Sequence, residues 1–238
     1  MILWIVLFLL VLLISFFLAY QSMRDFRIVP IKTGAEYGLF LVKNPVQLSV
    51  DILNFFGDQI AKQSLTLSFE RLFKGKQSAL VIFGPRQILM SLKGLSVLEL
   101  EDYTEKVLDD QIIAWEVGFK KPHPDGFNFT NLFEKLSELD PTDQFWWQVN
   151  LKAEQLKTNE NLFYTQIRCV LISNDPQRRK KLALELDKLG APALSKIPKP
   201  FSSQKILEFY QKRSLTLEKI NPRLTAGEVL NLIALAFK

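Results

Sequence analysis

The sequence predicts an α+β protein in which an N-terminal transmembrane helix precedes two ferredoxin-like units; the first has the element order βαββαβ and the second repeats it approximately. Three observations predict this class. Residues 2–20 form an apolar run without a single charged side chain. Beyond the run, short stretches that alternate apolar and polar residues, as strands do, lie between stretches with apolar residues at helical spacing. These stretches pass twice through the same order, once in residues 38–108 and again in residues 109–191.

The apolar run has the length and the flanks of a membrane anchor. As a helix it spans roughly 28 Å at about 1.5 Å per residue, close to the about 30 Å of a hydrocarbon core. A cleaved signal peptide is the alternative, but no Lys or Arg precedes the run, which is longer than a signal-peptide core of about 7–15 residues. Because Arg24, Arg27 and Lys32 follow the run, the positive-inside rule places the C-terminal portion in the cytoplasm. We therefore predict a single-pass protein of the inner (cytoplasmic) membrane, with an anchor at 1–23 and a juxtamembrane linker at 24–37.

The first predicted unit, residues 38–108, opens with the strand-like stretch GLFLVK. Asn44 and Pro45 suit the start of a helix, since proline is favoured in a first turn, and apolar residues then recur at helical spacing. The predicted elements are a strand at 38–43, a helix from about 45 to 62, strands at 65–69 and 78–83 joined by the turn FKGKQ, a helix at 86–94 and a strand at 97–103.

The second predicted unit, residues 109–191, repeats this order of strands and helices. Asp175 and Pro176 fit the N-cap and the first position of its last helix. The predicted elements are a strand at 112–119, a helix at 130–139, strands at 144–152 and 162–172, and a helix at 176–189.

Residues 192–238 are predicted to form a connector with C-terminal helices. The prolines of KIPKP stiffen the connector, and Ser202 or Ser203 can cap the helix that follows. Thr225 and Glu228 match the capping-box pattern at the start of a last, strongly apolar helix. Such a helix needs a surface to pack on, so either this domain or another domain or partner covers it.

No constellation typical of a catalytic, cofactor-binding or metal-binding site is recognisable in the sequence. The stretch at 75–78, GKQS, has Glu70 where a phosphate-binding loop has its first glycine, so we interpret it as a hairpin turn. His123 is the only histidine and Cys169 the only cysteine, which argues against a zinc site. Two further groups are assigned to the fold: a solvated strand face at Glu99, Glu101, Asp102 and Glu105, and a core strand at Phe145, Trp146 and Trp147. We therefore predict that the chain is not an enzyme and holds no cofactor.

A basic cluster is the one candidate binding site. Arg178, Arg179, Lys180 and Lys181 fall near the start of a predicted helix, where cations oppose the helix dipole. A solvated helix face is the first interpretation, and contact with DNA phosphates, lipid headgroups or an acidic partner is the alternative. The net charge of +5, from 30 Lys and Arg against 25 Asp and Glu, is compatible with both.

Four stretches and the tail carry a family resemblance. They are EYGLFLVKNP (36–45), LSFERLFKGKQSALVIFGP (67–85), DQFWWQVNLK (143–152), IRCVLISNDPQRRKKLALEL (167–186) and the tail LTAGEVLNLIALAF (224–237). In this order they resemble the membrane-anchored N-terminal region of type IV secretion and conjugation ATPases, and most closely an uncharacterised bacterial domain family that precedes such motors. The P-loop motor of those proteins is absent from this sequence, so the resemblance carries over no catalytic residue.

The resemblance implies an assembly or docking domain of a type IV secretion or conjugation-like translocation complex, non-catalytic by itself. The expected partners are the membrane and protein components, either a P-loop ATPase motor on a separate chain or other secretion components, with DNA as a further candidate. The expected form is an oligomer. Two alternatives stay open: a membrane-tethered nucleic-acid-binding module that uses residues 178–181, or an enzyme whose site forms at an oligomer interface.

Overall fold

The computed structural model describes most of the chain. The described residues are 2–25, 27–29, 36–92, 94–106, 109–119, 130–137, 139–155, 161–190, 194–197, 201–217 and 223–234. The statements below refer to these residues. His123, which the sequence analysis assigned to an exposed loop, lies outside them.

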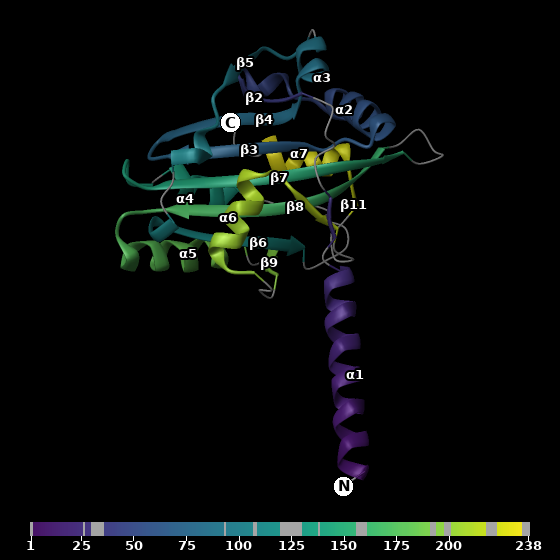
Figure 1. The fold of residues 1–238 in the computed structure, drawn as a ribbon. Coiled ribbons are helices and arrows are strands. Elements are labelled where there is room, and N and C mark those ends of the chain that lie inside the picture. The colour runs from purple at the N-terminus through teal and green to yellow at the C-terminus, as the bar shows by residue number, and fades with distance from the viewer. Residues whose placement is uncertain are drawn as a thin grey trace.

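The folded body is built on one antiparallel nine-stranded sheet (Figure 1). Its strands lie in the order β5-β2-β4-β3-β7-β8-β6-β9, and β11 pairs with β8. The strands are β2 (Tyr37–Val42), β3 (Leu67–Lys74), β4 (Gln77–Pro85), β5 (Val97–Leu100), β6 (Ile112–Phe119), β7 (Gln144–Gln155), β8 (Asn161–Ile172), β9 (Leu194–Lys196) and β11 (Arg223–Thr225). A separate two-stranded sheet joins β1 (Arg27–Val29) to β10 (Leu215–Leu217).

The prediction of two ferredoxin-like units behind a transmembrane helix is wrong as a description of the fold. Strand β3 pairs with β7 along its whole length, from Leu67 opposite Leu151 to Lys74 opposite Gln144. This pairing joins the β5-β2-β4-β3 half of the sheet to the β7-β8-β6-β9 half. One hydrophobic cluster also runs through both halves, since it includes Phe69 of β3 and Val149 of β7. The chain therefore forms a single mixed α+β body on one continuous sheet.

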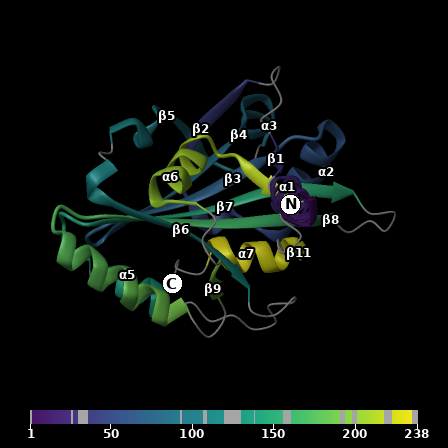
Figure 2. The same cartoon turned by 60° about the horizontal axis from the view of Figure 1, so that its bottom comes forward.

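The helices cover the two faces of this sheet unequally (Figure 2). Helices α2, α4, α5 and α7 contribute side chains to the large cluster on one face, whereas α6 packs on the opposite face over β6 and β8. The helices are α1 (Ile2–Asp25), α2 (Val50–Gln63), α3 (Arg86–Ser91), α4 (Thr130–Ser137), α5 (Pro176–Gly190), α6 (Ser203–Gln211) and α7 (Ala226–Ala234), with short 3₁₀ turns η1 (Pro45–Gln47), η2 (Tyr103–Lys106) and η3 (Asp109–Gln111).

Helix α1 projects from one end of the body (Figure 1). Within the part of the chain that the structure describes, no helix is both long and apolar enough to cross a membrane. The predicted anchor at 1–23 and the single-pass location in the inner membrane are therefore corrected.

The capping residues explain where three helices begin. Ser49, rather than Asn44, is the N-cap of α2, because its side chain accepts a hydrogen bond from the Ile52 amide. Pro45 instead opens the separate turn η1, so the predicted helix start was too early. For α5 the prediction is confirmed, since Asp175 Oδ1 accepts from the Gln177 amide at 2.8 Å. The capping box predicted for the last helix is confirmed by the reciprocal Thr225–Glu228 hydrogen bonds.

The last helix, α7, belongs to the core of this domain. Val229, Leu232 and Ile233 are buried and lie in the same hydrophobic cluster as residues of α2 and β8. This answers the question that the sequence left open about the surface that covers this helix. The adjacent Trp146 and Trp147 point to opposite faces of β7 and are both buried, which confirms their assignment to the core.

Candidate functional site: a buried polar row beneath helix α6

Four polar side chains lie directly opposite one another across the middle of the sheet. Glu70 on β3 faces Gln148 on β7, Gln148 faces Arg168 on β8, and Arg168 faces Glu116 on β6. We call these four residues the polar row. Their exposed fractions range from 0% to 4%, so the row is enclosed although two of its members pair as an acid and a base. Since side chains alternate along a strand, the row shares a face with Trp146 and therefore lies on the α6 side.

Arg168 joins the β7-β8-β6-β9 half of the sheet to the segment 201–217. Its Nε donates to Glu116 Oε1 at 2.8 Å, forming an ion pair in which both side chains are buried. Its Nη1 donates to the backbone carbonyls of Phe209 at 3.2 Å and Ser214 at 2.6 Å. Both carbonyls belong to the segment 201–217, which contains α6 and β10, so one guanidinium joins the sheet to this segment.

Gln166 adds a second link between the same two parts of the fold. Its Oε1 accepts hydrogen bonds from Arg168 Nη2 at 2.8 Å and from the Thr216 amide at 2.9 Å. Its Nε2 donates to Glu116 Oε1 at 2.9 Å and also to the Thr216 hydroxyl. Thr216 lies in the middle of β10, opposite Ile28 of β1, so this link reaches the strand that directly follows α1.

Glu70 is the acceptor at the other end of the row. Its Oε1 accepts from Arg213 Nε at 3.0 Å and from Gln148 Nε2 at 2.9 Å, and its Oε2 accepts from Tyr103 OH at 2.7 Å. Arg213 also forms an ion pair with Asp102, with Nη2 donating to Oδ1 at 3.1 Å. Arg213 thus connects the C-terminal end of α6 to the first half of the sheet.

These contacts determine the protonation of the groups around Glu70. Burial lowers the pKa of Arg213, but the Glu70 and Asp102 carboxylates raise it by more, so the pKa lies above its ordinary value. Burial raises the pKa of Asp102, but hydrogen bonds from Arg213 and Thr104 outweigh it and leave the pKa below 3.8. Burial, with the Glu70 charge, holds the pKa of Tyr103 well above 10.0. Arg213 and Asp102 are therefore charged at neutral pH, and Tyr103 keeps the proton that it donates.

The arrangement is suited to holding structure in place. The charged members are matched within the network, Arg168 by Glu116 and Arg213 by Glu70 and Asp102. A buried pair of this kind fixes which groups meet, because shifting the strand register would leave a charge unpaired inside the protein. Among the described residues, no group of three or more His, Cys, Asp or Glu side chains is arranged to hold a metal ion.

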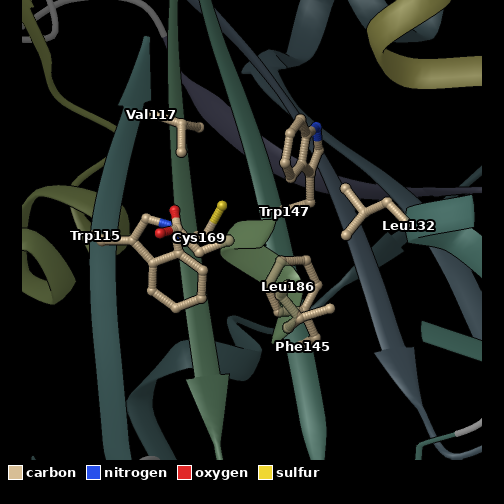
Figure 3. A pocket seen from close by; sticks show the side chains of 8 residues that line it. Trp115, Val117, Leu132, Phe145, Trp147, Cys169 and Leu186 are labelled. Atoms are coloured by element: carbon tan, nitrogen blue, oxygen red, sulfur yellow. The ribbon is translucent and has the colours of Figure 1, made fainter. Parts of the chain in front are cut away.

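A small cavity lies on the opposite face of the sheet, toward α4 and α5 (Figure 3). It has a volume of about 20 Å³, which is room for about one water molecule. Its lining is mostly apolar and comes from β6, β7, β8 and the two helices: Trp115, Val117, Leu132, Phe145, Trp147, Cys169, Leu186 and Asp187. Cys169, the single cysteine, is buried beside it.

The basic cluster predicted as a binding site is divided by the structure. Arg178 forms an ion pair with the buried carboxylate of Asp143 at 2.7 Å, and Arg179 Nη1 donates to the Ser173 carbonyl at 2.5 Å. Lys180 and Lys181 are exposed on α5. The two arginines therefore help attach α5 to the body, and the two lysines remain as candidates for phosphate contact.

The other sequence candidates also have structural positions. Gly75, at φ +55°, and Lys76 form the turn between β3 and β4, and Gln77 and Ser78 begin β4, which confirms the hairpin interpretation. Within the acidic group, Glu99 pairs with Arg86 at 2.5 Å, and Asp102 pairs with Arg213. The solvated face predicted for this group is thus wrong for Asp102, because a cation 111 residues away binds it.

The polar row itself was missed in the sequence. A signal was present, because each member is a polar residue inside a stretch of large apolar residues: Glu70 in LSFERLF, Glu116 in AWEVGF, Gln148 in FWWQVN and Arg168 in QIRCVL. A charged residue in such a strand is rarely fully buried unless it is paired. Four such strands in one chain therefore favour a shared polar layer.

Comparison with known proteins does not assign this chain to a family. Neither the family models nor the curated proteins contain a match to this chain. The resemblance to the N-terminal region of type IV secretion ATPases therefore stays a prediction.

Proposed function

We propose that this chain is a non-catalytic assembly or docking component of a multi-protein complex, and that the complex is a translocation machine of the type IV secretion or conjugation kind. The observation that carries the docking role is helix α1. Its described large apolar side chains, from Trp4 to Phe17, are between 49% and 73% exposed. A contiguous apolar surface of this kind marks an interaction site rather than ordinary protein surface.

The connection of α1 to the body supports the same proposal. Only residue 26 separates the end of α1 from β1, and β1 pairs with β10 at the edge of the polar row. Because this connection is short, a partner that binds α1 holds the body close to itself. The translocation machine is the finer part of the proposal, and it rests on the resemblance alone.

Site-specific photo-crosslinking tests the proposal in cells that produce the full chain together with a type IV secretion system and its P-loop ATPase. A crosslinker at Leu10 on α1 is expected to give an adduct with that ATPase or with another secretion component. The same crosslinker at Lys181, which is exposed on the body, is the matched control and should not give this adduct. Adducts from Lys181 alone, or ATP hydrolysis by the pure chain, would overturn the proposal.

A further inference from the structure

The two-stranded sheet of β1 and β10 contacts the main body through β10, whose described side chains, Leu215 and Thr216, are buried. We call this two-stranded sheet the clasp; its register pairs Arg27 with Leu217, Ile28 with Thr216 and Val29 with Leu215. It is not continuous with the nine-stranded sheet. An isolated two-stranded ribbon is only marginally stable in water, so the clasp depends on what lies beneath β10.

Beneath β10 the decisive contacts are polar. Thr216 is fully buried and exchanges two hydrogen bonds with Gln166, one through its amide and one through its hydroxyl. Arg168 reaches the carbonyl of Ser214, directly before the strand. Leu215 adds an apolar contact, since its side chain is only 1% exposed. By comparison, α6 is held by an apolar cluster that includes Ile206, Leu207 and Tyr210.

The backbone just before β10 is also held in an unfavourable conformation. Arg213 has φ +46°, in the left-handed region where a residue other than glycine costs roughly 1–2 kcal/mol. Its ion pairs with Glu70 and Asp102 keep it there. Buried ion pairs therefore hold the chain at the point where it changes direction between α6 and β10.

From these observations we infer that the clasp couples the position of α1 to the polar row. The clasp opens and closes as a unit when the hydrogen bonds between Gln166 and Thr216 break and form. A partner that holds α1 acts on β1 and β10, and through Thr216 on Gln166, Glu116 and Arg168. By reciprocity, a change in the row alters how firmly α1 is held. This inference does not depend on the identity of the partner.

Amide hydrogen exchange on the full chain, kept in solution with a mild detergent, tests the inference. Thr216→Val removes the hydroxyl and keeps the shape, so the amides of 27–29 and 215–217 should exchange about fivefold faster, the factor that corresponds to one net hydrogen bond. Gln166→Leu removes all the side-chain bonds and should have a larger effect on the same amides. Protection in β3 and β7 should stay as in the wild type.

Thr165→Val is the matched control, because Thr165 is equally buried but its hydroxyl bonds only to Phe163 in its own strand. It should leave exchange in the clasp unchanged. Unchanged exchange in the clasp of Thr216→Val would overturn the inference. So would a rise of equal size in β7, which would show that the contact supports the whole fold rather than the clasp.

Discussion

Glu70 and Arg213 are 143 residues apart in the sequence and form an ion pair in which neither side chain is more than 3% exposed. The pair joins the central strand β3 to the turn after α6, and Asp102 forms a second ion pair with the same guanidinium. Such a pair contributes to the specificity of the fold more than to its stability. Replacing both partners by apolar groups can leave the free energy of unfolding unchanged, whereas removing one partner leaves a buried charge.

Glu70→Gln should destabilise the protein strongly. The substitution keeps the size of the side chain but puts an amide NH2 group in place of a carboxylate oxygen that accepts buried hydrogen bonds, so we expect a loss of about 2 kcal/mol in the free energy of unfolding. Urea denaturation measures this loss. Glu208→Gln, which removes an exposed carboxylate that pairs with Lys205 and Lys212, is the control and should change the midpoint little. Equal effects of the two variants would contradict a special role for Glu70.

Two substitutions of Arg213 should differ in their effect because of its left-handed backbone. Arg213→Ala loses the ion pairs and keeps the unfavourable φ of +46°, whereas Arg213→Gly loses the same pairs and removes the backbone strain. Both should destabilise, and the glycine variant should be the more stable of the two by about 1 kcal/mol. Thermal unfolding of both variants at one pH gives the comparison. An alanine variant as stable as the glycine variant would show that the backbone relaxes.

Asp102 should make stability depend on acid pH. Its pKa in the folded protein lies below 3.8, so the unfolded chain takes up a proton before the folded one does. The stabilisation is therefore complete above about pH 4 and is lost as the pH falls through the lower pKa of the folded state. Urea midpoints measured down the acid range should fall more steeply for the wild type than for Asp102→Asn. Parallel pH profiles would remove Asp102 from this explanation.

Helix α7 should be required for folding of the body. Leu232 is 1% exposed within the main hydrophobic cluster, so Leu232→Ala should cost about 3 kcal/mol through lost burial and the cavity that remains. The exposed neighbour Asn231 provides the control, and Asn231→Ala should leave the melting temperature nearly unchanged. A small effect of Leu232→Ala would instead indicate that α7 serves another domain.

Strand bounds and helix caps could be predicted from the sequence because they depend on residues that are close together in the chain. The strand at 112–119 was predicted with the bounds of β6, and the cap at Asp175 and the capping box at Thr225 were found from residue type and spacing. The pairing of the strands in the sheet could not be predicted in the same way, because it joins distant segments. The strand at 65–69 was predicted from the alternation of apolar and polar residues, which is typical of a half-buried strand, yet β3 is buried on both faces and pairs with β7.

The candidate site was missed because its contacts join distant segments. Nothing near Glu70 in the sequence indicates that Arg213 will meet it, and Asp102 was interpreted as part of a solvated face because of the alternation along its strand. Arg168 was predicted only as part of the strand at 162–172. Because it is a charged residue among apolar neighbours, a buried partner could already have been expected for it. The rule that a buried charge needs a partner could be applied to the sequence, but only the fold shows that the partner of Arg168 is Glu116.

The cations of α5 provide the last prediction. Arg178→Ala should lower the melting temperature, because it leaves the buried carboxylate of Asp143 without its ion pair. Lys180→Ala combined with Lys181→Ala should leave the melting temperature unchanged, since both lysines are exposed. This double variant is therefore the proper test of phosphate contact: its affinity for a DNA duplex should fall, and the slope of log affinity against log salt should shrink by about two. Duplex binding of the double variant that matches the wild type in both affinity and salt slope would exclude α5 as the DNA contact, whereas changing all four cations together would confuse lost binding with lost structure.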